Sequence, residues 1–216
     1  MRLSDTPAVS RILKREYEKY HAPVIELIKI KTNDPFKVLV ATILSARTKD
    51  QTTAEVCERL FKRVERPHDF DRFSEADLAE LILPIGFFRT KARHLKQIPA
   101  VLDREFKGKI PETIDELCRL PGVGRKTANL VVSVAFDKHA ICVDVHVHRI
   151  CNRLGLLRTR TPFETEMKLR EILPKRYWKT WNRYLVSHGQ RVCLPIRPNC
   201  ADCPLAAYCA RVGVKA

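Results

Sequence analysis

The chain has 216 residues, and its 40 Lys and Arg residues against 25 Asp and Glu residues give a formal net charge of +15. Because this excess is spread along the chain rather than gathered in a tail, it indicates a folded protein that binds a polyanion. No apolar run is long enough to cross a bilayer and the first residues contain no apolar leader, so we expect neither a membrane span nor a signal peptide.

The pattern of apolar residues predicts an all-α protein. Few segments alternate apolar and polar residues, and several combine a helix-starting residue with apolar residues at helical spacing. The clearest helix covers residues 34–44, where Asp34 is the expected N-cap, Pro35 takes the first helical position, and an apolar stripe follows on one face. Similar helix starts occur at Ser74 and Thr161.

A glycine turn between two helices is the most informative segment. Thr113 begins a short helix, residues 120–126 read Leu-Pro-Gly-Val-Gly-Arg-Lys, and residues 125–136 form a second helix with a largely apolar end. Gly122 and Gly124, on either side of Val123, permit left-handed dihedrals and a close approach of another backbone. The amide groups at the start of the second helix predict an anion site. The alternative is an ordinary helix connection with Gly at a C-cap.

An amine and a carboxylate follow this turn. Lys126 is expected at the second position of the helix, where the helix dipole and the adjacent Arg125 disfavour the ammonium form. Asp144 lies in the apolar stretch 141–147, which is an uncommon place for a carboxylate without a partner. Each residue has a plainer interpretation, since Lys126 can simply bind phosphate and Asp144 can be the N-cap of a helix that follows it.

Cysteines near the C-terminus predict a metal site. Four of them occur with intervening segments of six, two and five residues, and without a secretory signal thiolate ligation of metal is favoured over disulfides. Only one short Cys-x-x-Cys pair is present, which favours an iron-sulfur cluster over zinc. The proposed ligands are Cys193, Cys200, Cys203 and Cys209. The other cysteines are expected to be buried free thiols: Cys57, Cys118, Cys142 and Cys151.

Several of these segments, in their order along the chain, resemble the endonuclease III family of DNA base-excision glycosylases. The resemblance rests on Leu-Pro-Gly-Val-Gly-Arg-Lys-Thr-Ala-Asn at 120–129, on Val-Asp-Val-His at 143–146, and on the cysteine loop. Leu-Ser-Ala-Arg-Thr-Lys-Asp at 44–50 and Ile-Gly-Phe-Phe-Arg-Thr-Lys at 85–91 also match family segments, so the resemblance covers nearly the whole chain.

The resemblance implies two helical domains with a DNA-binding cleft between them. A six-helix barrel that contains the helix-hairpin-helix would span residues 28–137. A discontinuous second domain would combine residues 1–27 and 138–216 and hold a 4Fe-4S cluster on the four cysteines. The cluster would fold the cysteine loop and present Arg197 to the DNA backbone, since metal ligation couples to folding.

The resemblance also implies the reaction. A member of this family removes an oxidised pyrimidine from duplex DNA and then nicks the strand. Lys126 would attack C1′ of the deoxyribose and form a Schiff base, from which β-elimination breaks the strand. Asp144 would stabilise positive charge on the sugar or help to deprotonate the amine.

The resemblance implies further residues that bind the DNA backbone or take part in base flipping. Gly122, Val123, Gly124 and Arg125 would hold the backbone. His146 would contact phosphate or pack. Arg47 and Phe87 match the positions of residues inserted into the gap that the flipped base leaves. For Phe87 the alternative is plain core packing. Arg47 stands where the bacterial pattern usually has Gln, which leaves the partner base and the preferred lesion open.

Two other functions remain open from the sequence. A mismatch glycosylase without lyase activity would typically have Tyr in place of Lys126, and a non-catalytic DNA-binding module would use its metal site for structure or redox sensing. The expected protein is a monomer in the cytoplasm, associated with the nucleoid, of a bacterium or archaeon. Its partner would be double-stranded DNA with an oxidised pyrimidine or an abasic site, and no membrane.

Overall fold

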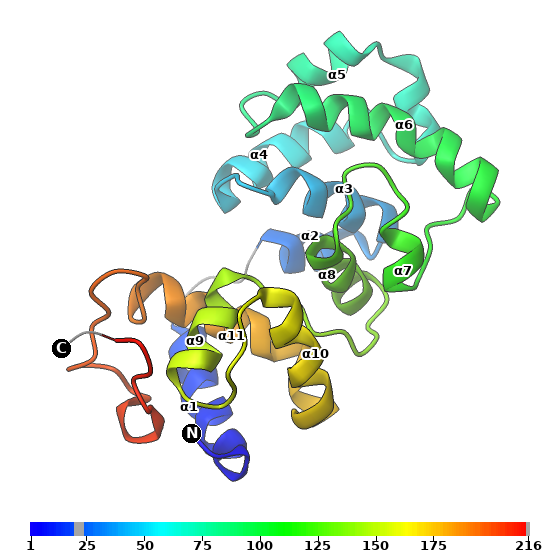
Figure 1. The fold of residues 1–216 in the computed structure, drawn as a ribbon. Helices are drawn as coiled ribbons and strands as arrows, with labels where there is room; N and C mark the ends of the chain where they lie inside the picture. The colour runs from blue at the N-terminus through cyan, green and yellow to red at the C-terminus, as the bar shows by residue number, and fades with distance from the viewer. Residues whose placement is uncertain (20–23, 215–216) are drawn as a thin grey trace. The chain divides into compact units, whose positions relative to one another are not determined.

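The computed structural model describes residues 1–19 and 24–214, and every regular element in these ranges is helical (Figure 1). The prediction of an all-α protein is therefore confirmed. No helix in the described ranges is long and apolar enough to cross a membrane. The chain divides into two compact units, Met1–His21 with His139–Ala216 and Ala22–Lys138. The predicted boundary after residue 27 falls within helix α2 (Val24–Thr32), a few residues after the first division of the structure. The predicted boundary after residue 137 lies one residue before the second division.

The unit Ala22–Lys138 is built around one helix. Helix α3 packs against α2, α4, α6 and α8, and eight of its eleven residues are buried. The sequence predicted an apolar stripe on one face, but Val38 and Ala41 are also fully buried, so neighbours surround the helix. The helices of this unit are α2 (Val24–Thr32), α3 (Pro35–Ser45), α4 (Asp50–Phe61), η2 (Pro67–Arg72), α5 (Glu75–Leu81), α6 (Phe88–Phe106), α7 (Ile114–Leu117) and α8 (Arg125–Ala135).

The unit that joins both ends of the chain has a core built from α1, α9, α10 and α11, which includes the fully buried Trp181. Its indole N–H donates to the Cys151 sulfur at 3.5 Å, and Leu205 from the cysteine loop joins the same core. Helix α11 contacts both α1 and α9. The helices of this unit are η1 (Leu3–Asp5), α1 (Thr6–Glu18), α9 (Val145–Arg153), α10 (Pro162–Ile172), η3 (Lys175–Tyr177), α11 (Trp178–Arg191) and η4 (Ala206–Tyr208).

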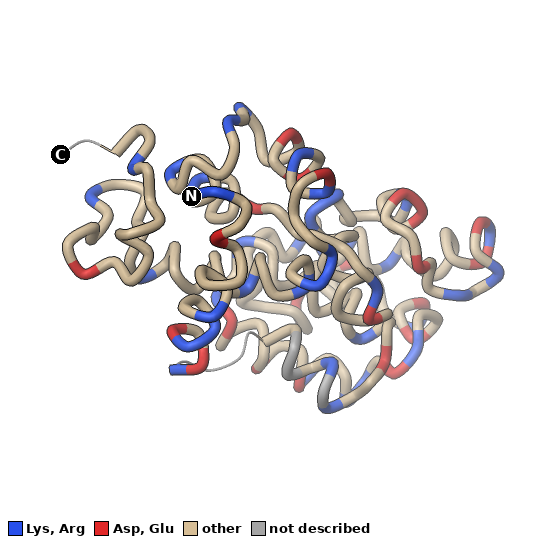
Figure 2. The backbone as a smooth tube through the Cα atoms, turned by 90° about the horizontal axis from the view of Figure 1, so that it is seen from below, with Lys and Arg blue, Asp and Glu red and all other residues tan. Residues whose placement is uncertain are grey.

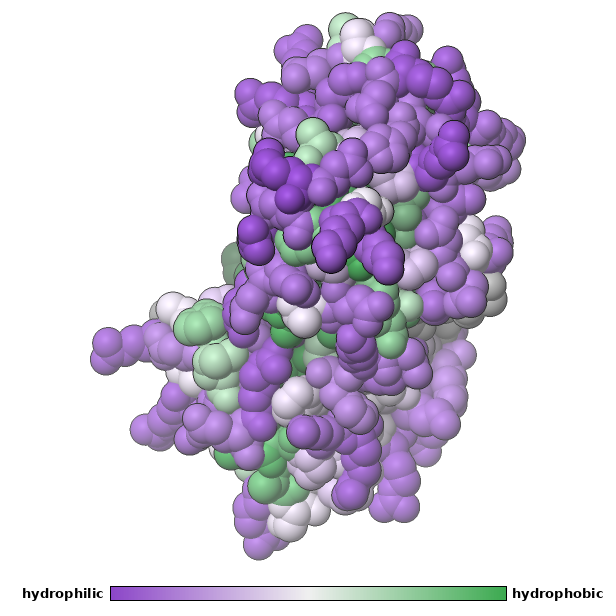
Figure 3. All heavy atoms as spheres, turned by 90° about the vertical axis from the view of Figure 1, so that its right-hand side faces the viewer, coloured by the Kyte–Doolittle hydropathy of each residue, from purple (hydrophilic) through white to green (hydrophobic). Residues whose placement is uncertain are grey.

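Charge and hydropathy follow the sequence-based expectation. Lys and Arg occur along the whole backbone tube rather than at one end (Figure 2). Hydrophilic residues cover most of the face in Figure 3, where hydrophobic residues appear only in small patches. That face therefore presents no broad apolar surface to a partner.

Candidate functional site

The glycine turn leads directly into helix α8. The Val123 N–H donates to the Leu120 carbonyl at 3.1 Å, and Gly122 between them has φ +76°, so with Pro121 the four residues have the pattern of a type II turn. A Cβ atom on Gly122 would lie 2.6 Å from Nδ1 of His94 on α6. Gly122 is thus required by its backbone conformation and by the packing of α6.

Gly124 is glycine for a different reason. It is the N-cap of α8 with φ −91° and ψ 171°, an extended conformation, so the expected left-handed backbone applies to Gly122 alone. A Cβ atom at Gly124 would meet nothing within 4 Å. Neither glycine ends a helix, because α7 has its C-cap at Cys118. The C-cap interpretation is therefore wrong, and Gly124 leaves open space at the start of α8.

Arg125 and Lys126 occupy the first two positions of α8. The opposite side of the helix is buried through Ala128, Asn129 and the valines that follow, which directs Lys126 into solvent. The Arg125 guanidinium forms an ion pair with Asp115 at 3.7 Å. The helix dipole and the backbone amides at this end favour an anion next to Lys126.

A second feature of the same unit brings Arg47 and Phe87 together. The guanidinium of Arg47 stacks on the Phe87 ring, 5.2 Å from its centroid. Phe87 is 61% exposed, so the core-packing interpretation of this residue is wrong. The pair presents an aromatic ring and a planar cation side by side at the protein surface.

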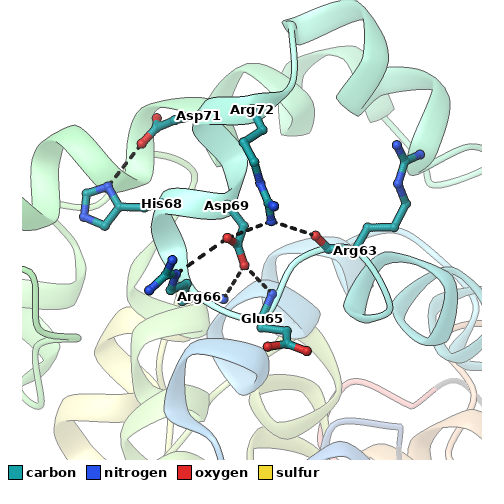
Figure 4. Close-up of polar contacts among 7 residues, drawn as sticks. All are labelled: Arg63, Glu65, Arg66, His68, Asp69, Asp71 and Arg72. Atoms are coloured by element: carbon teal, nitrogen blue, oxygen red, sulfur yellow. Dashed lines mark hydrogen bonds and ion pairs between the residues drawn. The ribbon is translucent and has the colours of Figure 1, made fainter.

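Arginines near η2 form a basic cluster around the carboxylate of Asp69 (Figure 4). Asp69 is buried beneath them, accepts from the N–H groups of Glu65 and Arg66 at 2.8 and 3.1 Å, and pairs with Arg72 at 2.8 Å. The hydrogen bond from the Glu65 amide is the main reason why the pKa of Asp69 lies below its usual value. This carboxylate organises a turn through backbone amides and arginines.

Asp144 belongs to the other unit and caps α9. Its Oδ1 accepts from the N–H groups of His146 and Val147 at 2.9 and 3.0 Å, and the residue is 9% exposed. The N-cap interpretation is confirmed, and it fixes the carboxylate in one orientation. His146 packs against α11, where a Cβ atom on Gly189 would lie 2.6 Å from its Nδ1. Its role in binding phosphate stays a prediction.

The four predicted cysteine ligands line one pocket, together with Arg153, His188 and Leu205. All four are free thiols. The pKa of Cys203 lies above its usual value, mainly because the residue is buried and in addition because the other three sulfurs are close to it. In the described part of the chain no three His, Cys, Asp or Glu side chains converge closely enough to hold one metal ion.

Two arginines on α9 that the sequence reasoning missed hold the start of the cysteine loop. Arg149 donates to the Cys193 carbonyl at 2.8 Å, and Arg153 donates to the Cys193 sulfur at 3.4 Å and to the Pro195 carbonyl at 2.8 Å. Their spacing of four residues on the helix that Asp144 caps is the signal that was available. Arg197, further along the loop, is exposed and has φ +52°.

The prediction that Cys118 is a buried free thiol is wrong. Cys57, Cys142 and Cys151 are buried, but Cys118 is exposed at the end of α7. A four-residue helix has too little surface to cover the residue that follows it.

Comparisons with known proteins agree with this geometry. Residues 40–175 match the family model described as HhH-GPD superfamily base excision DNA repair protein. Endonuclease III of Thermotoga maritima is 44% identical over 179 residues, which is 83% of this chain and 84% of that protein. Two solved structures each cover 95% of both chains: a non-covalent endonuclease III-DNA complex (36% identity, TM-score 0.81) and a trapped endonuclease III-DNA covalent intermediate with an estranged adenine (34%, 0.78). The chain therefore belongs to the endonuclease III family of DNA glycosylases and lyases, within the HhH-GPD superfamily of base excision repair proteins.

Proposed function

We propose that this protein removes oxidised pyrimidines from double-stranded DNA and nicks the strand through a Schiff base on Lys126. The observation that carries the proposal is the position of Lys126, exposed at the second residue of α8 and directly after a glycine turn. Further support comes from one of the similar solved structures, which is a trapped covalent intermediate between an endonuclease III and DNA.

The turn binds the DNA backbone in this proposal. The backbone of Gly122, Val123, Gly124 and Arg125 approaches a phosphate where no Cβ atom of Gly124 intervenes. The binding is independent of base sequence because it uses amide groups and the helix dipole. The net charge of +15 adds long-range attraction for duplex DNA.

Arg47 and Phe87 open the duplex. The stacked pair fills the gap that the flipped nucleotide leaves, since an aromatic ring and a guanidinium plane both stack on bases. Flipping costs a few kcal/mol, and the cost is lowest for a weakly paired lesion. The guanidinium can also donate two hydrogen bonds to a guanine opposite the lesion.

Lys126 then forms and breaks covalent bonds. Its neutral amine attacks C1′, the glycosidic bond breaks, and the base leaves with a proton that balances the one lost from the amine. Ring opening gives the Schiff base, loss of a proton from C2′ breaks the C3′–O bond, and water hydrolyses the imine to regenerate the lysine. Asp144 stabilises the positive charge that develops on the sugar or helps to deprotonate the amine. Because Asp144 is fixed by two amide donors, it needs no reorganisation during the reaction.

The cysteine pocket holds a 4Fe-4S cluster in this proposal. Four thiols line it, Arg153 donates to the Cys193 sulfur, and the spacing with only one short Cys-x-x-Cys pair favours a cluster over one zinc ion. The cluster would supply four Fe–S bonds that fold the loop. Cys193, Cys200, Cys203 and Cys209 then order the segment that carries Arg197 toward the phosphate backbone.

Borohydride trapping tests the proposal. We expect wild-type protein, mixed with duplex DNA that contains thymine glycol or an abasic site, to give a covalent adduct after reduction. Lys126→Ala should give none, whereas Lys138→Ala, which removes an exposed lysine of the same unit that pairs with Glu112, should trap normally. An adduct with Lys126→Ala, or none with wild type, contradicts the assignment, and base release without an adduct would indicate a monofunctional glycosylase.

A further inference from the structure

The Arg47–Phe87 pair is held in an unfavourable backbone conformation at both ends. Arg47 has φ +55° and Phe87 has φ +58°, the left-handed region that residues with a side chain rarely adopt. Each such residue costs about 1–2 kcal/mol, and the conformation persists only where contacts with the surroundings offset that cost. Arg47 and Phe87 are both strained, and their exposed side chains are in contact. Contacts elsewhere in the unit must therefore hold their backbone in place.

Lys91 contacts the backbone of the segment that carries Phe87 and the backbone of the segment just before Arg47. It lies one turn into α6, where its own N–H donates to the Phe87 carbonyl at 3.0 Å. Its ammonium donates to the carbonyls of Leu44 and Ala46 at 2.8 and 2.6 Å. Leu44 lies in the last turn of α3 and Ala46 is its C-cap, where helix carbonyls have no partner within the helix. One side chain thus ties the C-terminus of α3 to the N-terminus of α6.

A second contact closes the same junction. The Gly86 N–H donates to Oγ1 of Thr48 at 3.1 Å, and a Cβ atom on Gly86 would lie 2.6 Å from the Arg47 carbonyl oxygen. The segments before and after Arg47 are therefore both tied to the segment that carries Phe87. Any residue with a side chain in place of Gly86 would push the two segments apart.

Core packing does not explain a lysine at position 91. The side chain is only 7% exposed, and in the described part of the chain no carboxylate lies within ion-pair distance of its ammonium. Burial lowers the pKa of Lys91 to about 8. A Met of similar length would fill the same space without the cost of burying an ammonium. The feature that Lys91 adds over Met is the pair of hydrogen bonds to the α3 carbonyls.

We propose that Lys91 is a positioning residue whose buried ammonium clamps the end of α3 and so holds Arg47 and Phe87 in the geometry that opens DNA. This inference rests on the proposed role of that pair. Lys91 touches neither DNA nor the reacting atoms, and it acts only through the two loops that it joins.

The test measures base opening without any reaction. The probe is a duplex with a tetrahydrofuran abasic analogue opposite 2-aminopurine, whose fluorescence rises when the protein unstacks it. Lys91→Met should lower the base-opening equilibrium about tenfold, the size expected for losing hydrogen bonds from a charged donor. Lys96→Met is the matched control, because Lys96 also lies on α6 and donates to two backbone carbonyls, of Phe70 and Asp71, away from the pair. Its effect should stay within about twofold.

A double-mutant cycle separates positioning from general stability. In a background of Arg47→Ala with Phe87→Ala, Lys91→Met should have less than about a twofold further effect, because the groups it positions are gone. If Lys91→Met lowers opening equally in both backgrounds, or no more than Lys96→Met, the Lys91 inference is wrong and the role of the pair stands. If the double alanine variant opens DNA as well as wild type, both are wrong. Should Lys91→Met fail to fold in a thermal melt, Lys91→Gln, which retains a donor, takes its place in the cycle.

Discussion

Helices α8 and α9 both follow an N-cap residue with a proposed role in function, but their N-termini are built in opposite ways. Helix α8 begins at Gly124, which has no side chain and has open space where a Cβ atom would stand. Helix α9 begins at Asp144, whose carboxylate accepts from two of the first amides. The first N-terminus leaves space for the external anion that we propose, and the second uses an anion of its own.

The comparison shows that Asp144 is a helix cap, and the proposed catalytic role would use the same carboxylate. Asp144 is oriented by the same two hydrogen bonds that stabilise α9, so the helix pre-organises the residue. Lys126, in contrast, stands on a helix whose cap, Gly124, accepts a backbone hydrogen bond from Ala128 but offers no side chain. The two residues belong to different units of the chain and are positioned by different local rules.

The largest effect is expected from separating the two roles of Asp144. Asp144→Asn should keep the cap, because Asn is as good an N-cap as Asp, but lose the charge, so single-turnover excision should fall about 10²- to 10⁴-fold with little change in Tm. Asp144→Ala should reduce the excision rate by the same factor and, in addition, lower the free energy of unfolding by about 1 kcal/mol. Excision by the Asn variant within twofold of wild type would reduce Asp144 to a structural cap.

A carboxylate placed at the other N-terminus tests the opposite case. Gly124→Asp should fit without strain and stabilise α8 by a few tenths of a kcal/mol, since the backbone is extended and the Cβ atom meets nothing. The new anion should compete with phosphate and weaken DNA binding about tenfold, roughly the energy of one contact with a charged group. Measurement of Kd across salt concentrations, with Gly124→Asn as the uncharged control, checks this. Equal losses for Asn and Asp would argue against an electrostatic cause.

The smallest effect on activity is expected at Asp69, a buried carboxylate that accepts from backbone amides with no proposed contact to DNA (Figure 4). Asp69→Asn should lower the unfolding free energy by about 1–3 kcal/mol, because hydrogen bonds to a charged acceptor are lost, while excision per folded molecule is unchanged. The folded pKa of Asp69 is lowered, so its stabilisation is complete above the ordinary Asp value and is lost as pH falls through the folded pKa. Urea melts from pH 7 downward should show the Asn variant losing less stability than wild type. A variant with reduced excision at full folding would assign Asp69 a further role.

Local signals in the sequence predicted much of this molecule. The helix starts at Asp34, Ser74, Thr113 and Thr161 all appear as N-caps with side-chain hydrogen bonds. These succeed because capping is decided by neighbours within three residues. The type II turn at Gly122 belongs to the same class of local feature.

Other features depend on residues distant along the chain. The left-handed conformations of Arg47 and Phe87 follow from contacts with Lys91, Gly86 and Thr48, and no pattern around Arg47 marks them. Arg149 and Arg153 bind a loop forty residues away or more, so their spacing shows a helix face without showing what that face holds.

The sequence by itself determined the helices, the turn before α8, and the identity and spacing of the chemical groups, because these depend on dihedral preferences and on short-range hydrogen bonds. Only the tertiary structure decided that Phe87 is exposed, that Gly124 faces open space, and that the four cysteines line one pocket. Those outcomes depend on which surfaces the rest of the chain covers, and burial is a property of the packed unit rather than of any segment.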